Sequence, residues 1–298
     1  MQSTRFPIHV CIGAPRTGTT WLFNNLRDSS QVFLPCVKEV RYWWGPRSDA
    51  EKGLVLANQR KAQKGNADQL AWLDRWARTG EVSGPAYLKL MVQCNSPSLD
   101  ISPIYNTMPQ DRIAELSDAL PKESRILLIL RNPFERNSSA VRLHGYMHGR
   151  FRGAMADATL LAFMDRWFQR RHRDYVKTIR LWKHVFGERF GVFYYDELKD
   201  DPEGFLQQVA EFMGLTAPYC IGSKKAHLFY NTDRTRGRRQ VFPDLTSVQK
   251  WLVAGLSLAD AQAYAEIDPD MSARWSVSIQ AEYRKSSVGS DIPKSDPV

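Results

Sequence analysis

The stretch CIGAPRTGTTWL, residues 11–22, decides the fold, because it joins an apolar strand to a helix through a tight turn. Ile8–Gly13 is apolar enough for a buried strand, and Thr19–Arg27 has the apolar spacing of a helix. Gly13 and Gly18 allow the backbone to turn tightly and to approach a ligand closely. The amides at the start of the following helix would face an anion. The Gly-Lys-Ser/Thr of a nucleoside-triphosphate loop is missing, however.

Strand and helix patterns alternate along the rest of the chain, and the best strands are apolar throughout. This predicts an α/β fold with a central parallel sheet, flanked by helices on both faces, in a P-loop-like nucleotide-binding architecture. We expect one domain over residues 1–284 with helical insertions, and a disordered tail over 285–298. Further elements are predicted as a strand at 31–35, one helix or a helix pair at 58–78, a helix at 112–121, a strand at 125–130, helices from Pro133 and over 160–185, a strand ended by a polar turn over 190–202, and a helix at 202–214.

The charge balance favours anionic partners. The chain of 298 residues has 41 basic and 32 acidic residues, a net charge of +9. Charge alone does not choose among nucleic acid, a nucleotide and a sulfated glycan. The 4 cysteines are far apart and form no Cys-x-x-Cys pair, so a zinc site is not expected.

No apolar run approaches the ~20 residues that cross a bilayer, so stable membrane insertion is not expected. We read no signal peptide at the N-terminus. These features favour a bacterial-type cytoplasmic protein with free thiols. A Golgi-lumenal domain trimmed of its anchor would look similar.

The loop after the first strand has the groups that an anion needs. Amides of Thr17, Gly18, Thr19 and Thr20 would point out of the helix start, where the helix dipole favours negative charge. Arg16 adds a permanent charge and a planar fork suited to phosphate or sulfate oxygens. The alternative is an ordinary strand–turn–helix with threonine caps.

A second loop of this kind begins in RNPFERNSSAVRLH, residues 131–144. Arg131 ends an apolar strand, and Ser139 lies about two helical turns further on. Together these two residues could bind a second anion. Arg136 and Arg142 lie nearby and are read as facing either this anion or solvent.

The two segments, in this order, resemble the sulfotransferase family that uses 3'-phosphoadenosine 5'-phosphosulfate (PAPS). GAPRTGTTWL is similar to the loop that holds the 5'-phosphosulfate in that family, which implies this role for Arg16 through Trp21. The segment from Arg131 resembles the 3'-phosphate segment, and Arg131 and Ser139 match its two phosphate-binding positions. The resemblance implies PAPS as the donor, 3'-phosphoadenosine 5'-phosphate (PAP) as the product, and no metal.

The resemblance continues over roughly residues 8–243. KEVRYW (38–43) is similar to the carbohydrate branch, which includes the heparan sulfate enzymes, and DISPIY (100–105) resembles the segment lining the acceptor cleft there. RTRGRR (234–239) resembles a late loop that closes over the nucleotide. That loop implies cofactor-binding roles for Arg236, Gly237 and Arg238, with Phe229 or Tyr230 against the adenine.

The family's chemistry implies catalytic roles for four residues. Arg16 and Lys38 would supply positive charge, and Glu39 would take the proton of the acceptor. We expect the apolar wall of Trp43 and Trp44 to raise the pKa of Glu39. The alternative is a glutamate paired with Lys38 or Arg41, and His144 is the rival base.

The acceptor is the open part of this interpretation. A small molecule or a glycan is expected, and five aromatic residues either line its cleft or belong to the core: Tyr42, Trp43, Trp44, Tyr105 and Tyr146. Ile101 stands where the heparan sulfate branch usually has lysine, which counts against a heparan-like acceptor. Arg16 stands where the family often has lysine, and it keeps the charge.

Two other classes of function compete with this one. A nucleotide kinase or other phosphate-loop enzyme would use the same fold, but the missing Gly-Lys-Ser/Thr and Mg²⁺-binding aspartate count against it. A non-catalytic binder of anions or nucleic acid is suggested by the charge, but no recognition motif supports nucleic acid as a partner.

Overall fold

The computed structural model describes residues 6–27, 29–44, 49–62, 66–79, 82–92, 96–147, 162–163, 174–216 and 244–287. The chain divides into two compact units. The first comprises Met1–Leu130 and Arg180–Phe229, and the second comprises Arg131–Ile179 and Tyr230–Val298. Each unit is described by itself below.

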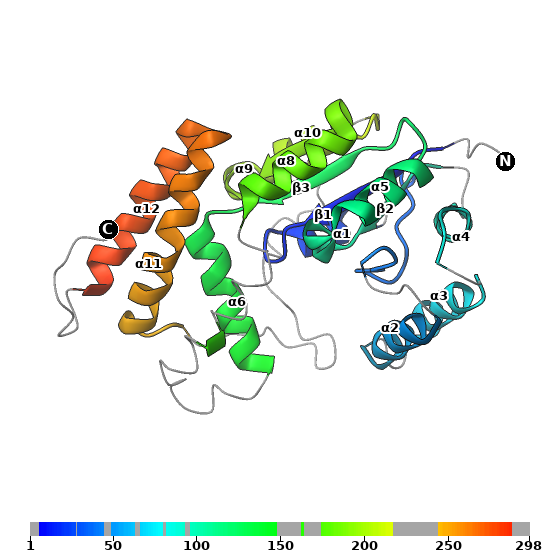
Figure 1. Ribbon diagram of the computed structural model, residues 1–298, viewed down its shortest axis with the longest axis horizontal. Helices are drawn as coiled ribbons and strands as arrows, with labels where there is room; N and C mark the ends of the chain where they lie inside the picture. The colour runs from blue at the N-terminus through cyan, green and yellow to red at the C-terminus, as the bar shows by residue number, and fades with distance from the viewer. Residues whose placement is uncertain are drawn as a thin grey trace. The chain divides into compact units, whose positions relative to one another are not determined.

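A parallel sheet of four strands forms the centre of the first unit (Figure 1). Its strands are β1 (Ile8–Gly13), β2 (Ser98–Ile101), β3 (Ile126–Leu130) and β4 (Phe190–Tyr194), in the spatial order β2-β1-β3-β4. The predicted α/β fold with a central parallel sheet is therefore confirmed. The chain leaves β1 for one side of the sheet and later returns to its other side, so a topological switch point lies between β1 and β3. Ligands of open α/β sheets bind at the carboxyl ends of the strands at such a point.

The sheet is covered on both faces. Successive side chains of a strand point to opposite faces, and every residue of β1 and β3 is buried. One face packs against α1 (Thr19–Leu26), α9 (Tyr195–Asp200) and α10 (Pro202–Phe212), which share a core with Cys11 and Leu127. The uniformly apolar strands of the sequence are therefore explained by burial on both sides.

The structure describes further helices in the first unit, and not all of them were predicted. They are α2 (Asp49–Ala62), α3 (Ala67–Ala77), α4 (Gly84–Met91), η1 (Pro103–Thr107), α5 (Gln110–Ala119) and η2 (Gly187–Arg189). The segment predicted as one helix or a pair is a pair, because Asn66 caps α3 by accepting the Gln69 amide at 3.0 Å. The polar turn predicted after β4 is the helix α9, whose first turn contains Asp196 and Glu197.

The prediction of a strand at 31–35 is wrong. Among the described residues, a single isolated bridge forms there, between Phe33 and Ser98. The Phe33 amide donates to the Pro97 carbonyl at 2.8 Å, and the Leu99 amide donates to the Phe33 carbonyl at 2.9 Å. Pro35 has no N–H group, so the pairing does not continue.

The second unit is helical. It contains α6 (Pro133–Met147), part of α8 (Tyr175–Phe186), α11 (Ser247–Ala263), η3 (Tyr264–Glu266) and α12 (Pro269–Ser287). The helix predicted to start at Pro133 is confirmed. A capping box of Thr246 and Gln249 begins α11, and the rings of Tyr264 and Trp275 lie 5.1 Å apart near its end. Neither α11 nor α12 was predicted. Within the described residues, none of the helices combines the length and the apolar character that crossing a bilayer requires.

Candidate functional site

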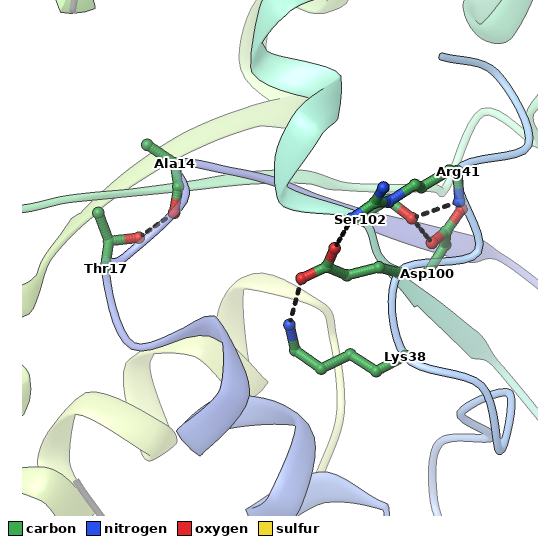
Figure 2. A network of polar contacts seen from close by, with 7 residues as sticks. Ala14, Thr17, Lys38, Arg41, Asp100 and Ser102 are labelled. Atoms are coloured by element: carbon green, nitrogen blue, oxygen red, sulfur yellow. Dashed lines mark hydrogen bonds and ion pairs between the residues drawn. The ribbon is translucent and has the colours of Figure 1, made fainter. Parts of the chain in front are cut away.

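The loop between β1 and α1 lies at the carboxyl end of β1. Its backbone is closed by a local hydrogen bond, because the Thr17 hydroxyl donates to the Ala14 carbonyl at 2.7 Å (Figure 2). The Ala14 amide donates to the Ile129 carbonyl of β3 at 2.9 Å. The loop therefore begins at the carboxyl ends of β1 and β3, at the switch point. Thr17 is buried, so water does not compete for the hydrogen bond by which its hydroxyl stabilises the turn.

Arg16 has a backbone conformation that ordinary residues rarely adopt. Its φ is 72°, and that of Gly18 is 88°. A left-handed arginine costs of the order of 1–2 kcal/mol, and such strain concentrates at functional sites. At Gly18 a Cβ atom would also lie 2.7 Å from Leu198 and 3.0 Å from Tyr195. The shape of the loop thus requires glycine at position 18.

The start of α1 has the character of an anion site. Gly18 is its N-cap residue, and glycine has no side chain with which to cap the first amides of the helix. The first turn contains no acidic residue. Thr20 is exposed and Thr19 is buried. Trp21, which the sequence placed with the cofactor, is buried in the core with its ring 6.2 Å from that of Phe205.

A second group of charged residues lies in the segment from Lys38 to Trp43, which we call the charged segment. The Lys38 ammonium contacts Glu39 Oε1 at 3.0 Å, and the Arg41 guanidinium contacts Glu39 Oε2 (Figure 2). Burial raises the pKa of Glu39, but Lys38 and Arg41 outweigh it and lower the pKa to about 2. The expected raised pKa is therefore wrong, because the carboxylate lies between two cations and not against the apolar wall.

The charged segment is strained in the same way as the loop. Glu39 has a φ of 63° and Arg41 a φ of 58°. The backbone amides of both residues donate hydrogen bonds to Ile101, the last residue of β2, or to the residue that follows it. The Glu39 amide donates to the Ile101 carbonyl at 3.0 Å, and the Arg41 amide donates to the Ser102 hydroxyl at 3.0 Å.

Asp100 on β2 is a site residue that the sequence interpretation missed. Its carboxylate is fully buried and accepts from the hydroxyls of Ser102 at 2.7 Å, Tyr105 at 3.0 Å and Tyr87 at 3.1 Å. Burial raises the pKa of Asp100 to about 6 against these hydrogen bonds, which lower it. The signal in the sequence was an aspartate within an otherwise buried strand, followed closely by serine and tyrosine.

The aromatic residues that the sequence offers for the acceptor cleft separate into core and surface. Tyr42, Trp43 and Tyr105 are buried, while Trp44 is 44% exposed. The Trp44 indole donates to the Thr107 hydroxyl at 3.0 Å, which fixes the orientation of its ring. Trp44 is therefore the one exposed aromatic residue among these four. The side chain of Tyr146 lies outside the described residues.

Arg131 and Ser139 belong to the second unit. Arg131 Nε contacts Glu135 Oε2 at 3.0 Å, and the Arg131 carbonyl accepts from the Tyr175 hydroxyl at 2.9 Å. Ser139 is buried on α6. Arg136 is also buried, with its guanidinium 5.3 Å from the centre of the Tyr175 ring, so the reading of Arg136 as facing solvent is wrong.

Several predicted site residues fall outside the described part of the chain. The backbone of His144 lies in α6, but its side chain is not described. The nucleotide-closing loop is also outside the described residues, with Phe229, Tyr230, Arg236, Gly237 and Arg238. Among the residues that are described, no group of three or more His, Cys, Asp or Glu side chains is placed to hold a metal ion.

Comparisons with known proteins identify the family and the fold. A family profile described as the sulfotransferase family matches residues 7–219. A solved sulfotransferase from Alicyclobacillus acidocaldarius aligns with a TM-score of 0.54 and 17% identity, over 88% of this chain and 96% of that chain. The sulfotransferase domain of the Synechococcus PCC 7002 olefin synthase aligns with a TM-score of 0.51 and 16% identity, over 96% of both chains. These structures share the fold. The search of curated protein sequences found no match.

Proposed function

The chain belongs to the sulfotransferase family, and we propose that it transfers the sulfuryl group of PAPS to a hydroxyl of a carbohydrate-containing or small-molecule acceptor. An amine is the second choice of acceptor group. The observation that carries this proposal is the loop at the switch point of the sheet. There a strained Arg16 precedes a helix that begins after a glycine N-cap and has no acidic residue in its first turn. Such a helix start fits an anionic group.

The donor supplies an activated sulfuryl group that leaves a phosphate behind. In the proposed reaction the acceptor oxygen forms a bond to sulfur while the bond from sulfur to the bridging oxygen breaks. The electron pair of that bond moves to the phosphate oxygen, and the acceptor proton moves to a base. Arg16 and the amides from Thr17 to Thr20 stabilise the developing negative charge. We assign Arg131 and Ser139 to the 3'-phosphate, following the family resemblance.

Glu39 is our proposed base, and its ion pairs with Lys38 and Arg41 determine how readily it accepts a proton. A carboxylate with a pKa of about 2 is ionised at neutral pH, but it is a weak proton acceptor. It becomes stronger when Lys38 or Arg41 moves away from it. An anionic sulfuryl group competes for both cations, so binding of the donor would raise the basicity of Glu39. His144 remains the rival base.

Ligand-induced thermal shifts test the donor. PAP should stabilise the protein without Mg²⁺, because a ligand that binds only the folded state stabilises it by RT ln(1 + [L]/Kd). ATP with Mg²⁺ should stabilise the protein much less, and the reverse result would favour a nucleotide kinase. Binding to polynucleotide that weakens steeply with salt would instead favour a nucleic-acid binder.

Arg131→Ala tests the second anion site. Loss of a charge-assisted contact to phosphate should weaken PAP binding at least about 100-fold, as measured by calorimetry. Arg60→Ala is the control, since Arg60 is an exposed arginine on α2 that pairs with Asp74 at 2.6 Å. If both variants bind PAP as the unmodified protein does, the assignment of Arg131 is wrong.

A further inference from the structure

The charged segment is connected to Asp100 through two relays of the same design. In the first, the Arg41 amide donates to the Ser102 hydroxyl at 3.0 Å, and this hydroxyl donates to Asp100 Oδ1 at 2.7 Å (Figure 2). In the second, the Trp43 amide donates to the Tyr105 hydroxyl at 3.2 Å, and this hydroxyl donates to Asp100 Oδ2 at 3.0 Å. One buried carboxylate thus reaches two backbone amides of the segment.

The direction of these hydrogen bonds is set by the groups that make them. A backbone amide can only donate, so each hydroxyl accepts a hydrogen bond from the segment and has its own O–H left to donate to another acceptor. Asp100 accepts the hydrogen bonds of both hydroxyls, and it also accepts one from Tyr87 at 3.1 Å. Because both of its oxygens act as acceptors, the arrangement requires Asp100 without its proton.

The relays hold a backbone that would otherwise relax. Arg41 has a positive φ, a conformation that persists only when surrounding contacts maintain it. Arg112 adds a contact from α5, since its Nε donates to the Trp43 carbonyl at 3.3 Å. The side chains of Lys38 and Glu39 depend on the same backbone, because they precede Arg41 directly.

We infer that Asp100, through Ser102 and Tyr105, is a positioning residue that holds the charged segment in the geometry needed for sulfuryl transfer. This inference rests on the proposed function, because Lys38 and Glu39 are assigned there to the reaction. Asp100 itself touches neither the donor nor the acceptor. Its effect is transmitted through the amides of Arg41 and Trp43.

Two buried tyrosines provide a matched test. Tyr87 and Tyr105 each donate to Asp100 Oδ2, at 3.1 Å and 3.0 Å. Of these two described hydroxyls, the one of Tyr105 also accepts from an amide of the charged segment, that of Trp43. Tyr105→Phe should therefore lower kcat about 10-fold to 100-fold, the range expected when a reacting group is displaced slightly. Tyr87→Phe should keep kcat within about twofold. The KM for PAPS should change less than kcat in the Tyr105→Phe variant, since the relays bind the amides of Arg41 and Trp43.

Ser102→Ala tests the other relay. Ser102→Ala should also lower kcat. If these substitutions acted only by loosening the core, Tyr87→Phe would lower kcat as much as they do. The acceptor for these assays is the one that gives wild-type turnover in a screen of phenols, alcohols and sugars with labelled PAPS.

Hydrogen exchange gives a readout that does not need turnover. Tyr105→Phe should speed exchange of the Trp43 amide at least about tenfold, Ser102→Ala should do so for the Arg41 amide, and Tyr87→Phe should change neither. Equal loss of kcat in the two tyrosine variants, or unchanged exchange of both amides, would overturn the inference. A wild-type protein that transfers nothing from PAPS would overturn the proposed function instead, and the exchange rates would still decide whether the relays hold the segment.

Discussion

The loop after β1 and the charged segment reach a similar strained backbone by opposite means. Arg16 in the loop and Glu39 and Arg41 in the segment all have positive φ. The loop is closed by a bond between Thr17 and Ala14, three positions apart in the chain. The segment is held by Ser102 and Tyr105, about sixty positions away. The loop therefore has a local hydrogen bond in addition to its contacts with β3, whereas the hydrogen bonds that hold the backbone of the segment come from distant residues.

This difference should separate the effects of mutations. The loop presents backbone amides and one arginine, so we expect its changes to act on the donor. The segment presents charged side chains on a backbone held from a distance, so we expect its changes to act on proton transfer and the acceptor. Five experiments follow from this division, from the largest expected effect to the smallest.

Removal of the loop arginine should have the largest effect. Arg16→Ala should lower kcat about 10³-fold, because a positive charge that stabilises the leaving phosphate is lost. Arg16→Lys is the matched control, since lysine keeps the charge, and it should recover most of the activity. Steady-state kinetics with saturating PAPS measure both. Equal activity of the two variants would show that the charge of Arg16 is not used in the reaction.

Neutralising the carboxylate of the charged segment should come next. Glu39→Gln should lower kcat about 100-fold while PAP binds as before, because a glutamine cannot take the acceptor proton. His144→Ala is the comparison for the rival base. If Glu39→Gln keeps its turnover and His144→Ala loses it, the base is the histidine, and the charged segment serves only to bind.

The pH dependence of turnover should show the titration of Asp100. Its pKa is raised to about 6, so turnover should fall as the pH is lowered through about 6, when the relays lose their acceptor. The titratable groups that act on this carboxyl stay neutral there: burial raises the pKa of Tyr87 and Tyr105 well above 10, and that of Cys11 to about 12. Glu39, with a pKa of about 2, stays ionised throughout this range.

The contribution of Asp100 to stability should fall with rising pH over the same range, whereas turnover rises. The folded pKa of Asp100 lies above the value of about 3.9 for an unfolded aspartate, so its contribution to stability is fully present below about pH 4. That contribution is lost as the pH rises through 6. Asp100→Asn should remove this part of the slope in a plot of unfolding free energy against pH. A slope equal to that of the wild type would contradict the raised pKa.

The exposed aromatic residue should have the smallest effect. Trp44→Ala should raise the KM of the acceptor about tenfold or less, because an exposed ring offers a stacking face to sugars and other rings. Thr107→Ala, which frees the indole without removing it, should have a still weaker effect. An unchanged acceptor KM in Trp44→Ala would exclude this ring from the acceptor site.

The same division explains what the sequence could predict. β3 was predicted because it is apolar throughout, and β1 because it is apolar except for His9. The loop between β1 and α1 was predicted because its glycines and threonines are neighbours in the chain. The pairing of Glu39 with both Lys38 and Arg41 was only an alternative, since neighbours in sequence do not reveal which side chains meet.

The relays to Asp100 could not be predicted, because their members come from β2, η1, the residue between these two elements and the charged segment. Only the fold brings these hydroxyls to one carboxylate. The helices α11 and α12 are a different case. The capping box of Thr246 and Gln249 was a local signal in the sequence, and it could have located the start of α11.

The left-handed residues have a consequence for protein engineering. Glycine or asparagine would fit the backbone at Arg16, Glu39 and Arg41 with less strain than the residues now present. A library selected only for heat resistance would therefore enrich such replacements, each of which removes a charge from the candidate site. Directed evolution of this protein needs a selection for turnover in every round, or the gain in heat resistance will come from the positions that its chemistry needs most.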